Sequence, residues 1–283
     1  MASSSEHPVD SARQPMSAAQ LRVADDASAG AWIAPTLGGE FGAVTLQVPS
    51  GYAAYVRIPH PAMDDCDAPV SWSDVAAATG RQAHALMQWH ALVGSPDSLN
   101  FTGSLWCGGP PERGDLAPAP FAVLCDLLAA HTHSPTECFF GIWEGWAWVH
   151  GGGIRFTLVD DAALRAGIVP TTEPMPAAFT EQERDRARLI LPHREYVLLT
   201  GPLAAASQIG DPQGLGGFEP HSPNLMWPAD RAWFVASEID FDSTLVGGTT
   251  DLIQAILDCS ALEAWAIQPD SSLACDADKI NLV

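Results

Sequence analysis

The chain has 283 residues, 47% of them hydrophobic, and includes ten tryptophans, a composition that excludes an intrinsically disordered protein and allows a sizeable buried core. Its 34 acidic residues outnumber 13 basic ones and give a formal net charge of −21. Because nucleic-acid binding depends on lysine and arginine at the phosphates, this charge excludes a nucleic-acid-binding protein. The sequence has no apolar run of about 18 residues, which excludes a membrane-spanning helix.

The N-terminal segment, which begins MASSSEHPVDSARQPMS, is polar and has no apolar stretch of the kind found in secretory signals. We therefore expect a disordered tail over residues 1–30 and a cytoplasmic protein. The six cysteines lie far apart without a CxxC pair. This spacing favours reduced thiols over a disulfide framework or a zinc site, and we expect neither a metal nor a cofactor.

The first half of the chain predicts two strands and two helical regions. The segments GAVTLQV and YAAYVRI, between residues 31 and 58, have the apolar content of strands. Residues 71–93 predict a helix with Ser71 or Ser73 as its N-cap, divided in two at Gly80. A loop rich in glycine and proline follows over 94–120, and FAVLCDLLAAHT (121–132) predicts another helix.

The second half predicts mostly strands. CFFGIWEGWAWVHGGGIRFTLVDD (138–161) has the pattern of a hairpin that turns at three glycines. Residues 181–190 predict a short charged helix, 194–203 a strand, 207–230 an irregular segment and 231–241 a strand. A helix over 249–259 and a strand over 261–267 follow. Hairpins mixed with helices predict an α+β fold with a largely antiparallel sheet and a few packed helices, in a single domain over 31–283; a subdivision near 170 is the alternative.

Tryptophans mark the candidate binding surface. In GIWEGWAWVH, strand alternation would place Glu144, Trp146, Trp148 and His150 on one face. Two indole rings beside a carboxylate and an imidazole can bind a flat or cationic ligand, or they can cover a helix in the core. NLMWPADRAWF adds Trp227 and Arg231 to this predicted ligand or partner surface.

The motif DFDST (240–244) resembles the first motif of the haloacid dehalogenase superfamily. The resemblance implies that Asp240 is a nucleophile attacking phosphorus and that Asp242 is a general acid and base. That superfamily also has a lysine downstream, whereas the sole lysine here, Lys279, follows the motif by only 35 residues. We therefore expect a structural role for the motif: a strand that ends between Asp240 and Thr244 and turns through two glycines into a helix.

Three longer segments carry a second resemblance. SPNLMWPADRAWFVASEIDFDSTLVGG (222–248), CFFGIWEGW (138–146) and LPHREYVLLTGPL (191–203) are similar to segments of an actinobacterial protein family with no assigned function. This resemblance implies that DFDST belongs to a strand of that family. It implies no activity.

These observations favour a non-catalytic acidic protein that acts by binding another protein, in a regulatory, adaptor or immunity-like role. The expected partner is a basic protein, because the acidic charge would attract it; we expect no nucleic acid and no membrane as partners. Two alternatives remain open. One is a magnesium-dependent phosphohydrolase with an aspartyl nucleophile at Asp240 and Asp242, and the other is a small-ligand binder that uses the tryptophan-lined face.

Overall fold

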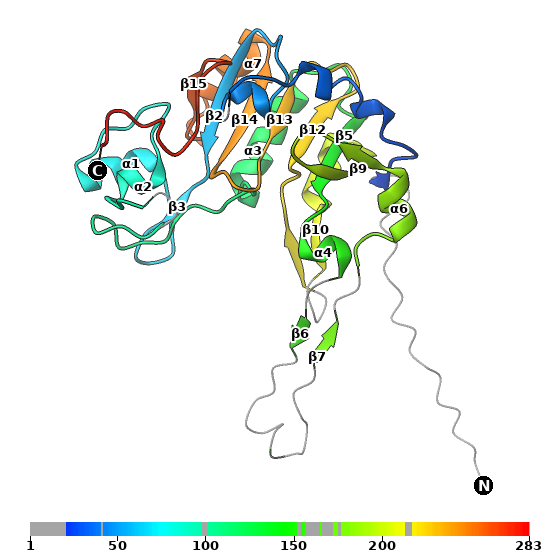
Figure 1. The fold of residues 1–283 in the computed structure, drawn as a ribbon, viewed down its shortest axis with the longest axis horizontal. Coiled ribbons are helices and arrows are strands. Elements are labelled where there is room, and N and C mark those ends of the chain that lie inside the picture. The colour runs from blue at the N-terminus through cyan, green and yellow to red at the C-terminus, as the bar shows by residue number, and fades with distance from the viewer. Residues whose placement is uncertain are drawn as a thin grey trace.

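The computed structural model describes residues 21–282 except for 41, 98–100, 152–153, 157–164, 166–171, 175–176 and 213–216. Within this part of the chain, nine strands form one sheet in which every pair is antiparallel (Figure 1). The strands lie in the order β1 (Arg22–Val23), β9 (Glu195–Gly201), β5 (Cys138–Trp143), β12 (Leu225–Pro228), β13 (Phe234–Ala236), β14 (Ser243–Gly248), β2 (Ala54–Pro59) and β15 (Trp265–Ile267), and β8 (Arg188–Ile190) also pairs with β9. The predicted α+β fold with a largely antiparallel sheet is confirmed.

Helices and short ribbons surround this sheet. The described α-helices are α1 (Trp72–Thr79), α2 (Trp89–Leu92), α3 (Pro118–Ala129), α4 (Ala147–His150), α6 (Glu181–Arg186) and α7 (Thr250–Leu257). The 3-10 helices are η1 (Ser28–Gly30), η2 (Ala34–Thr36), η3 (Val44–Leu46) and η4 (Leu203–Gln208). Two-stranded ribbons are formed by β3 (Ala62–Met63) with β4 (Pro69–Val70), β6 (Ile154–Phe156) with β7 (Thr172–Pro174), and β10 (Gly210–Pro212) with β11 (Phe218–Pro220). None of the described helices has the length and apolar character needed to cross a membrane.

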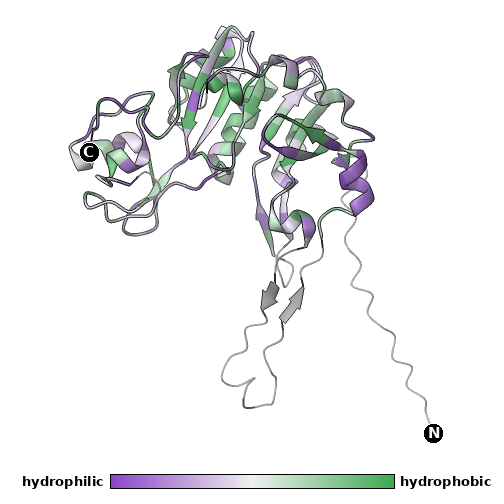
Figure 2. Cartoon of the chain, viewed as in Figure 1, coloured by the Kyte–Doolittle hydropathy of each residue, from purple (hydrophilic) through white to green (hydrophobic). Residues whose placement is uncertain are grey.

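Both faces of the sheet are buried. Successive residues of a strand point to opposite faces, so Val246 of β14 lies in a core cluster with α3 and α7, while Leu245 lies in a second cluster with the η1–η3 segment. Strand β9 is divided between the two clusters in the same way. This burial explains why the strands are nearly continuous apolar runs, which appear green in Figure 2, while α6 is hydrophilic throughout.

A third core cluster lies beyond the sheet, around α1 and α2 (Figure 1). Helix α1 begins where the Ser71 hydroxyl accepts a hydrogen bond from the backbone N–H of Asp74, and it ends at Gly80, whose φ of 70° is left-handed. The predicted N-cap and the helix end at Gly80 are confirmed, but the prediction of helix directly after Gly80 is wrong, because residues 81–88 are not helical and α2 covers only Trp89–Leu92. The indole rings of Trp72 and Trp89 pack together in this cluster with centroids 5.6 Å apart.

The other predicted helices are present, but α3 and α6 have different ends. Helix α3 begins and ends slightly before its predicted range, and α7 lies within its predicted range. The Thr249 side chain caps α7 by accepting a hydrogen bond from the backbone N–H of Leu252. Helix α6 has a complete capping box between Thr180 and Glu183. It ends at Arg186, however, and Arg188–Ile190 forms strand β8, so the prediction of a helix to residue 190 is wrong.

The predicted hairpin over 138–161 is wrong. Strand β5 pairs with β9 and β12, which are distant in sequence, and the chain then turns into α4. Gly145 permits this turn because a Cβ there would lie 2.1 Å from the Trp143 ring, and Gly151, with a φ of 74°, ends α4. Trp146, Trp148 and His150 therefore do not share a strand face with Glu144. Residues 157–161 of the predicted hairpin lie outside the described residues.

Two predictions near the N-terminus are also corrected. GAVTLQV forms η3 in place of a strand, because the N–H of Val48 bonds to the carbonyl of Val44 and buries both valines on one side of a turn. The predicted tail over 1–30 extends too far, because β1 pairs with β9 and Leu21 is 5% exposed. The alternative prediction, a division into two domains near residue 170, falls on residues that the structure does not describe.

Residues 207–230 are more regular than predicted. They contain β10, β11 and the fully buried strand β12, which lies between β5 and β13 in the middle of the sheet. Strand β12 ends at Pro228, which has no N–H to donate to the sheet. The high glycine and proline content of this segment obscured a short strand that pairs with the distant β5 as well as with the neighbouring β13.

Candidate functional site

The structure separates two of the predicted surface residues, because Trp227 lies in the core whereas Arg231 is exposed. The Trp227 ring is 1% exposed and stacks between Phe139 and Phe234, with centroids 5.6 and 5.7 Å away. The Arg231 guanidinium lies 4.8 Å from the centroid of the Trp32 ring. Trp227 therefore belongs to an aromatic cluster on the second face of the sheet, and Arg231 contacts that cluster from the surface.

Trp146 and Trp148 surround a histidine that the sequence did not connect with them. The imidazole of His221 stacks on both indole rings, with centroids 6.1 and 5.9 Å away and interplanar angles of 13° and 7°. Its Nδ1 lies 2.6 Å from a carboxylate oxygen of Asp115, whose other oxygen accepts the N–H of Ser222. The two tryptophans predicted to bind a ligand are therefore both stacked against an imidazole of the protein itself.

The contact with Asp115 raises the pKa of His221 above its ordinary value, against the opposing effect of burial. A pKa that is higher in the folded than in the unfolded state stabilises the protein fully below the unfolded value of about 6.5, and the stabilisation is lost as pH rises through the folded pKa. We predict that the difference in unfolding free energy between wild type and His221→Gln is largest at pH 5.5 and shrinks towards pH 9. Urea unfolding across this range measures it.

Asp115→Asn provides the control for this prediction. The variant keeps the shape of the contact but removes the charge, so the pKa of His221, followed by NMR titration, is expected to fall. A difference between wild type and His221→Gln that stays constant from pH 5.5 to 9 would contradict the assignment of the stabilisation to the charged imidazolium.

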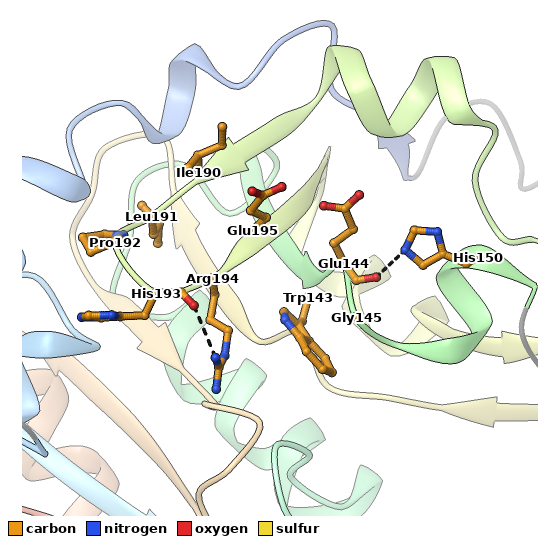
Figure 3. Close-up of a pocket in the computed structure, with 10 residues that line it drawn as sticks. All are labelled: Trp143, Glu144, Gly145, His150, Ile190, Leu191, Pro192, His193, Arg194 and Glu195. Atoms are coloured by element: carbon orange, nitrogen blue, oxygen red, sulfur yellow. Dashed lines mark hydrogen bonds between the residues drawn. The ribbon is translucent and has the colours of Figure 1, made fainter.

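Glu144 and His150 lie in an open depression that we call the acidic groove. It has a volume of about 590 Å³ and is lined by Trp143, Glu144, Gly145, His150 and the residues 190–195. Figure 3 shows the carboxylates of Glu144 and Glu195 side by side in it, with His150 beyond them and Trp143 below. The ring Nε2 of His150 lies 2.7 Å from the backbone oxygen of Glu144, which fixes this end of the groove.

Carboxylates outnumber cations around the acidic groove. Arg188 contacts three of them, Glu144, Asp185 and Glu195, at 3.2, 2.9 and 2.9 Å. Arg194 contacts Glu238 and Asp240 at 2.9 and 2.6 Å. Around Arg188, three carboxylates against one guanidinium leave an excess of two negative charges, whereas Glu238 and Asp240 line a second pocket and not the groove. Glu144 is also the main reason that the pKa of Arg188 is raised.

The DFDST motif spans a hairpin and does not form the end of a central parallel strand. Strand β13 ends at Ala236 and β14 begins at Ser243, so Asp240 lies in the connecting turn. Asp240 binds Arg194, whereas Asp242 lies 3.5 Å from the buried Arg57. The prediction of a strand that ends between Asp240 and Thr244 and turns through Gly247 and Gly248 is wrong, since β13 ends at Ala236 and both glycines lie inside β14, just before α7. With the two carboxylates committed to different arginines, this geometry differs from the one the superfamily resemblance implies.

The cysteines and the one acidic cluster offer little chemistry. All six cysteines are free, and burial raises the pKa of Cys125 and of Cys138 to about 12, which keeps both thiols protonated. Among the described residues, Asp64, Asp65 and Cys66 are the only group close enough to share a metal ion. An oxygen of Asp64 there accepts the N–H groups of Cys66 and Ala68, so this carboxylate organises the β3–β4 turn.

Sequence reasoning missed the residues that connect these features. The turn between β8 and β9, which contains Leu191, Pro192, His193 and Arg194, borders the acidic groove on one side and a second, apolar pocket on the other. The segment LPHREYVLLTGPL was named for its predicted strand over 194–203 and for its family resemblance, and nothing local in it indicates that Arg194 reaches Asp240, 46 residues later.

No protein-family model, curated protein or solved structure matches the chain. The resemblance to actinobacterial segments therefore stays a prediction, and the function has to be argued from the site alone.

Proposed function

We propose that this chain is a non-catalytic binding protein whose acidic groove docks a basic segment of a partner protein. The observation that carries this proposal is the local excess of carboxylates around Arg188, three against one guanidinium, beside an open groove that Glu144 and Glu195 line. It has the same sign as the formal net charge of −21. Opposite charges across an interface steer association and exclude partners of like charge. The cytoplasmic location predicted from the sequence is part of this proposal.

The apolar surface of the groove supports a protein as the partner. Ile190 is 64% exposed at its rim, and the half-buried ring of Trp143 forms part of its wall. Protein interfaces combine such aromatic and aliphatic anchors with a polar rim. Strand β8, on which Ile190 lies, pairs with β9 alone among the described strands. An extended basic segment could therefore lie along the groove beside this strand.

We predict that eight-residue peptides with two arginines and one leucine at varied spacing bind the protein, and that Glu144→Gln/Glu195→Gln weakens the best of them about tenfold. The two substitutions remove two of the groove's negative charges, and a tenfold loss corresponds to about 1.4 kcal/mol. Isothermal calorimetry measures the affinities, and binding of the wild type should weaken as salt is raised from 50 to 300 mM.

Asp65→Asn/Asp67→Asn is the matched control, because it changes the net charge equally in an exposed turn of another region. Asp67 has a φ of 60°, which asparagine tolerates. The control is expected to bind the peptides like the wild type. The proposal fails if no arginine-containing peptide binds, or if the two double variants lose affinity equally.

A further inference from the structure

The second pocket lies on the other side of the 191–194 turn, above the sheet. It has a volume of about 320 Å³. Side chains of three strands line it, namely Tyr196 of β9, Leu225 of β12 and Ala236 of β13. The opposite wall comes from the N-terminal segment around η2 and η3, with Leu37, Leu46 and Gln47. We call this space the apolar pocket; small-molecule sites are typically concave and mostly apolar, with volumes of roughly 300–1,000 Å³.

Two polar groups belong to the apolar pocket. The side-chain oxygen of Gln47 is buried and lacks a hydrogen-bond partner among the described residues. A buried polar atom without a hydrogen bond costs about 1–3 kcal/mol. Tyr196 is only 6% exposed and places a phenol in the wall of the pocket. A molecule in the pocket that donates a hydrogen bond to Gln47 would recover the cost at that atom.

The chemistry of these groups limits the ligand. Burial raises the pKa of Tyr196, so the phenol stays neutral and can donate its proton in a hydrogen bond. The Gln47 oxygen can only accept one. At the edge of the pocket, Arg194 is paired with both Glu238 and Asp240, which leaves one negative charge in excess. A carboxylate or phosphate in the pocket would therefore not find an unpaired positive charge at Arg194.

We propose that the apolar pocket binds a small, neutral or singly cationic molecule with an apolar ring and a hydroxyl or amide group. The ring would contact Leu225 and Ala236 on the sheet and Leu46 opposite them. The hydroxyl or amide would accept the hydrogen bond of Tyr196 and donate one to Gln47. This site does not depend on the acidic groove, because none of these five residues lines the groove.

Single-ring probes test this proposal: 2-phenylethanol, phenylacetamide and tyramine, with phenylacetate as the anionic counterpart. We expect saturation-transfer NMR to detect the first three with the full wild-type chain and phenylacetate to bind at least tenfold more weakly. Tyr196→Phe removes one hydroxyl and is expected to weaken phenylacetamide about fivefold, the effect of losing a hydrogen bond of about 1 kcal/mol. Leu46→Trp fills the pocket from its half-buried wall and is expected to abolish binding of all three.

Leu105→Trp is the matched control for the added ring, because Leu105 is 44% exposed and lies outside both depressions. It is expected to bind the probes like the wild type. The proposal is overturned if no probe binds, if phenylacetate binds best, or if binding survives Leu46→Trp. Unchanged affinity in Tyr196→Phe overturns the polar contact that defines the ligand class. Basic peptides should bind Leu46→Trp normally, so failure of either proposal is distinguishable from failure of the other.

Discussion

Replacement of Arg57 by methionine is expected to lower the free energy of unfolding by about 3–5 kcal/mol, the usual effect of removing one partner of a buried ion pair. Arg57 lies in β2, is 1% exposed, and bonds to Ser243, to Asp242 and to the backbone oxygens of Ala85 and Met87. Methionine has similar length but no donors. The carboxylate and the two backbone oxygens would therefore lose their partner in a region that water reaches poorly.

Arg57 also connects two core clusters. The guanidinium lies 5.1 Å from the centroid of the Trp72 ring in α1, while its backbone is part of the central sheet. We therefore expect amide hydrogen exchange in α2 and in the preceding loop to accelerate more than exchange in β5 or β9. Urea unfolding measures the total effect.

Arg22→Met is the control, since Arg22 forms an exposed ion pair with Asp25 three residues away. Exposed pairs contribute about 0–1 kcal/mol, so this variant should be nearly as stable as the wild type. A loss of less than 1 kcal/mol in Arg57→Met would show that the buried network contributes little.

Substitution of Trp227 by alanine is expected to destabilise the protein by about 3–5 kcal/mol, because it removes a large side chain from a closed core. The Trp227 ring contacts Phe139 and Phe234 face to face and the edge of Trp32, with centroids 5.6, 5.7 and 6.4 Å away. Trp227→Phe keeps an aromatic ring in the stack and should lose less than half as much. Thermal unfolding of the three proteins measures the difference.

The outcome bears directly on the surface role expected from the sequence. A tryptophan on a ligand or partner surface could be replaced with a change of at most about 0.5 kcal/mol in stability. Phe218→Ala is the comparison, since Phe218 is 48% exposed and should behave in that way. Equal small effects of Trp227→Ala and Phe218→Ala would contradict the core assignment.

Local signals predicted the start and end of α1 and the start of α7 well. The cap at Ser71, the left-handed Gly80 and the polar start of α7 each act within four residues, so the sequence around them contains all the information needed. Strand pairing depends on residues that are far apart, and the sequence could not supply it. Strand β5 was interpreted as half of a hairpin with the residues that follow it, although it pairs with the distant β9 and β12.

The candidate site was predicted in part for the same reason. Glu144 and His150 do line a groove, but the turn after β5 places Glu144 there and α4 places His150 there, and strand alternation does not. The alternation in GIWEGWAWVH could not reveal that Asn224 accepts hydrogen bonds from both the backbone of Trp143 and the ring of Trp146, and so supports the turn between them. His221 likewise comes from a distant ribbon. Contacts of this kind leave no local pattern in the sequence.

The position of β2 in the sheet has a consequence for how the chain folds during its synthesis. Both neighbours of this early strand, β14 and β15, come from residues beyond 240, and its Arg57 bonds to a serine 186 positions later. While the ribosome makes the intervening residues, β2 has two unpaired edges and an apolar surface of the kind that associates with other chains. Pairing over such separations is slow, because a long loop must close first. The newly made chain should therefore depend on chaperones until β14 has emerged.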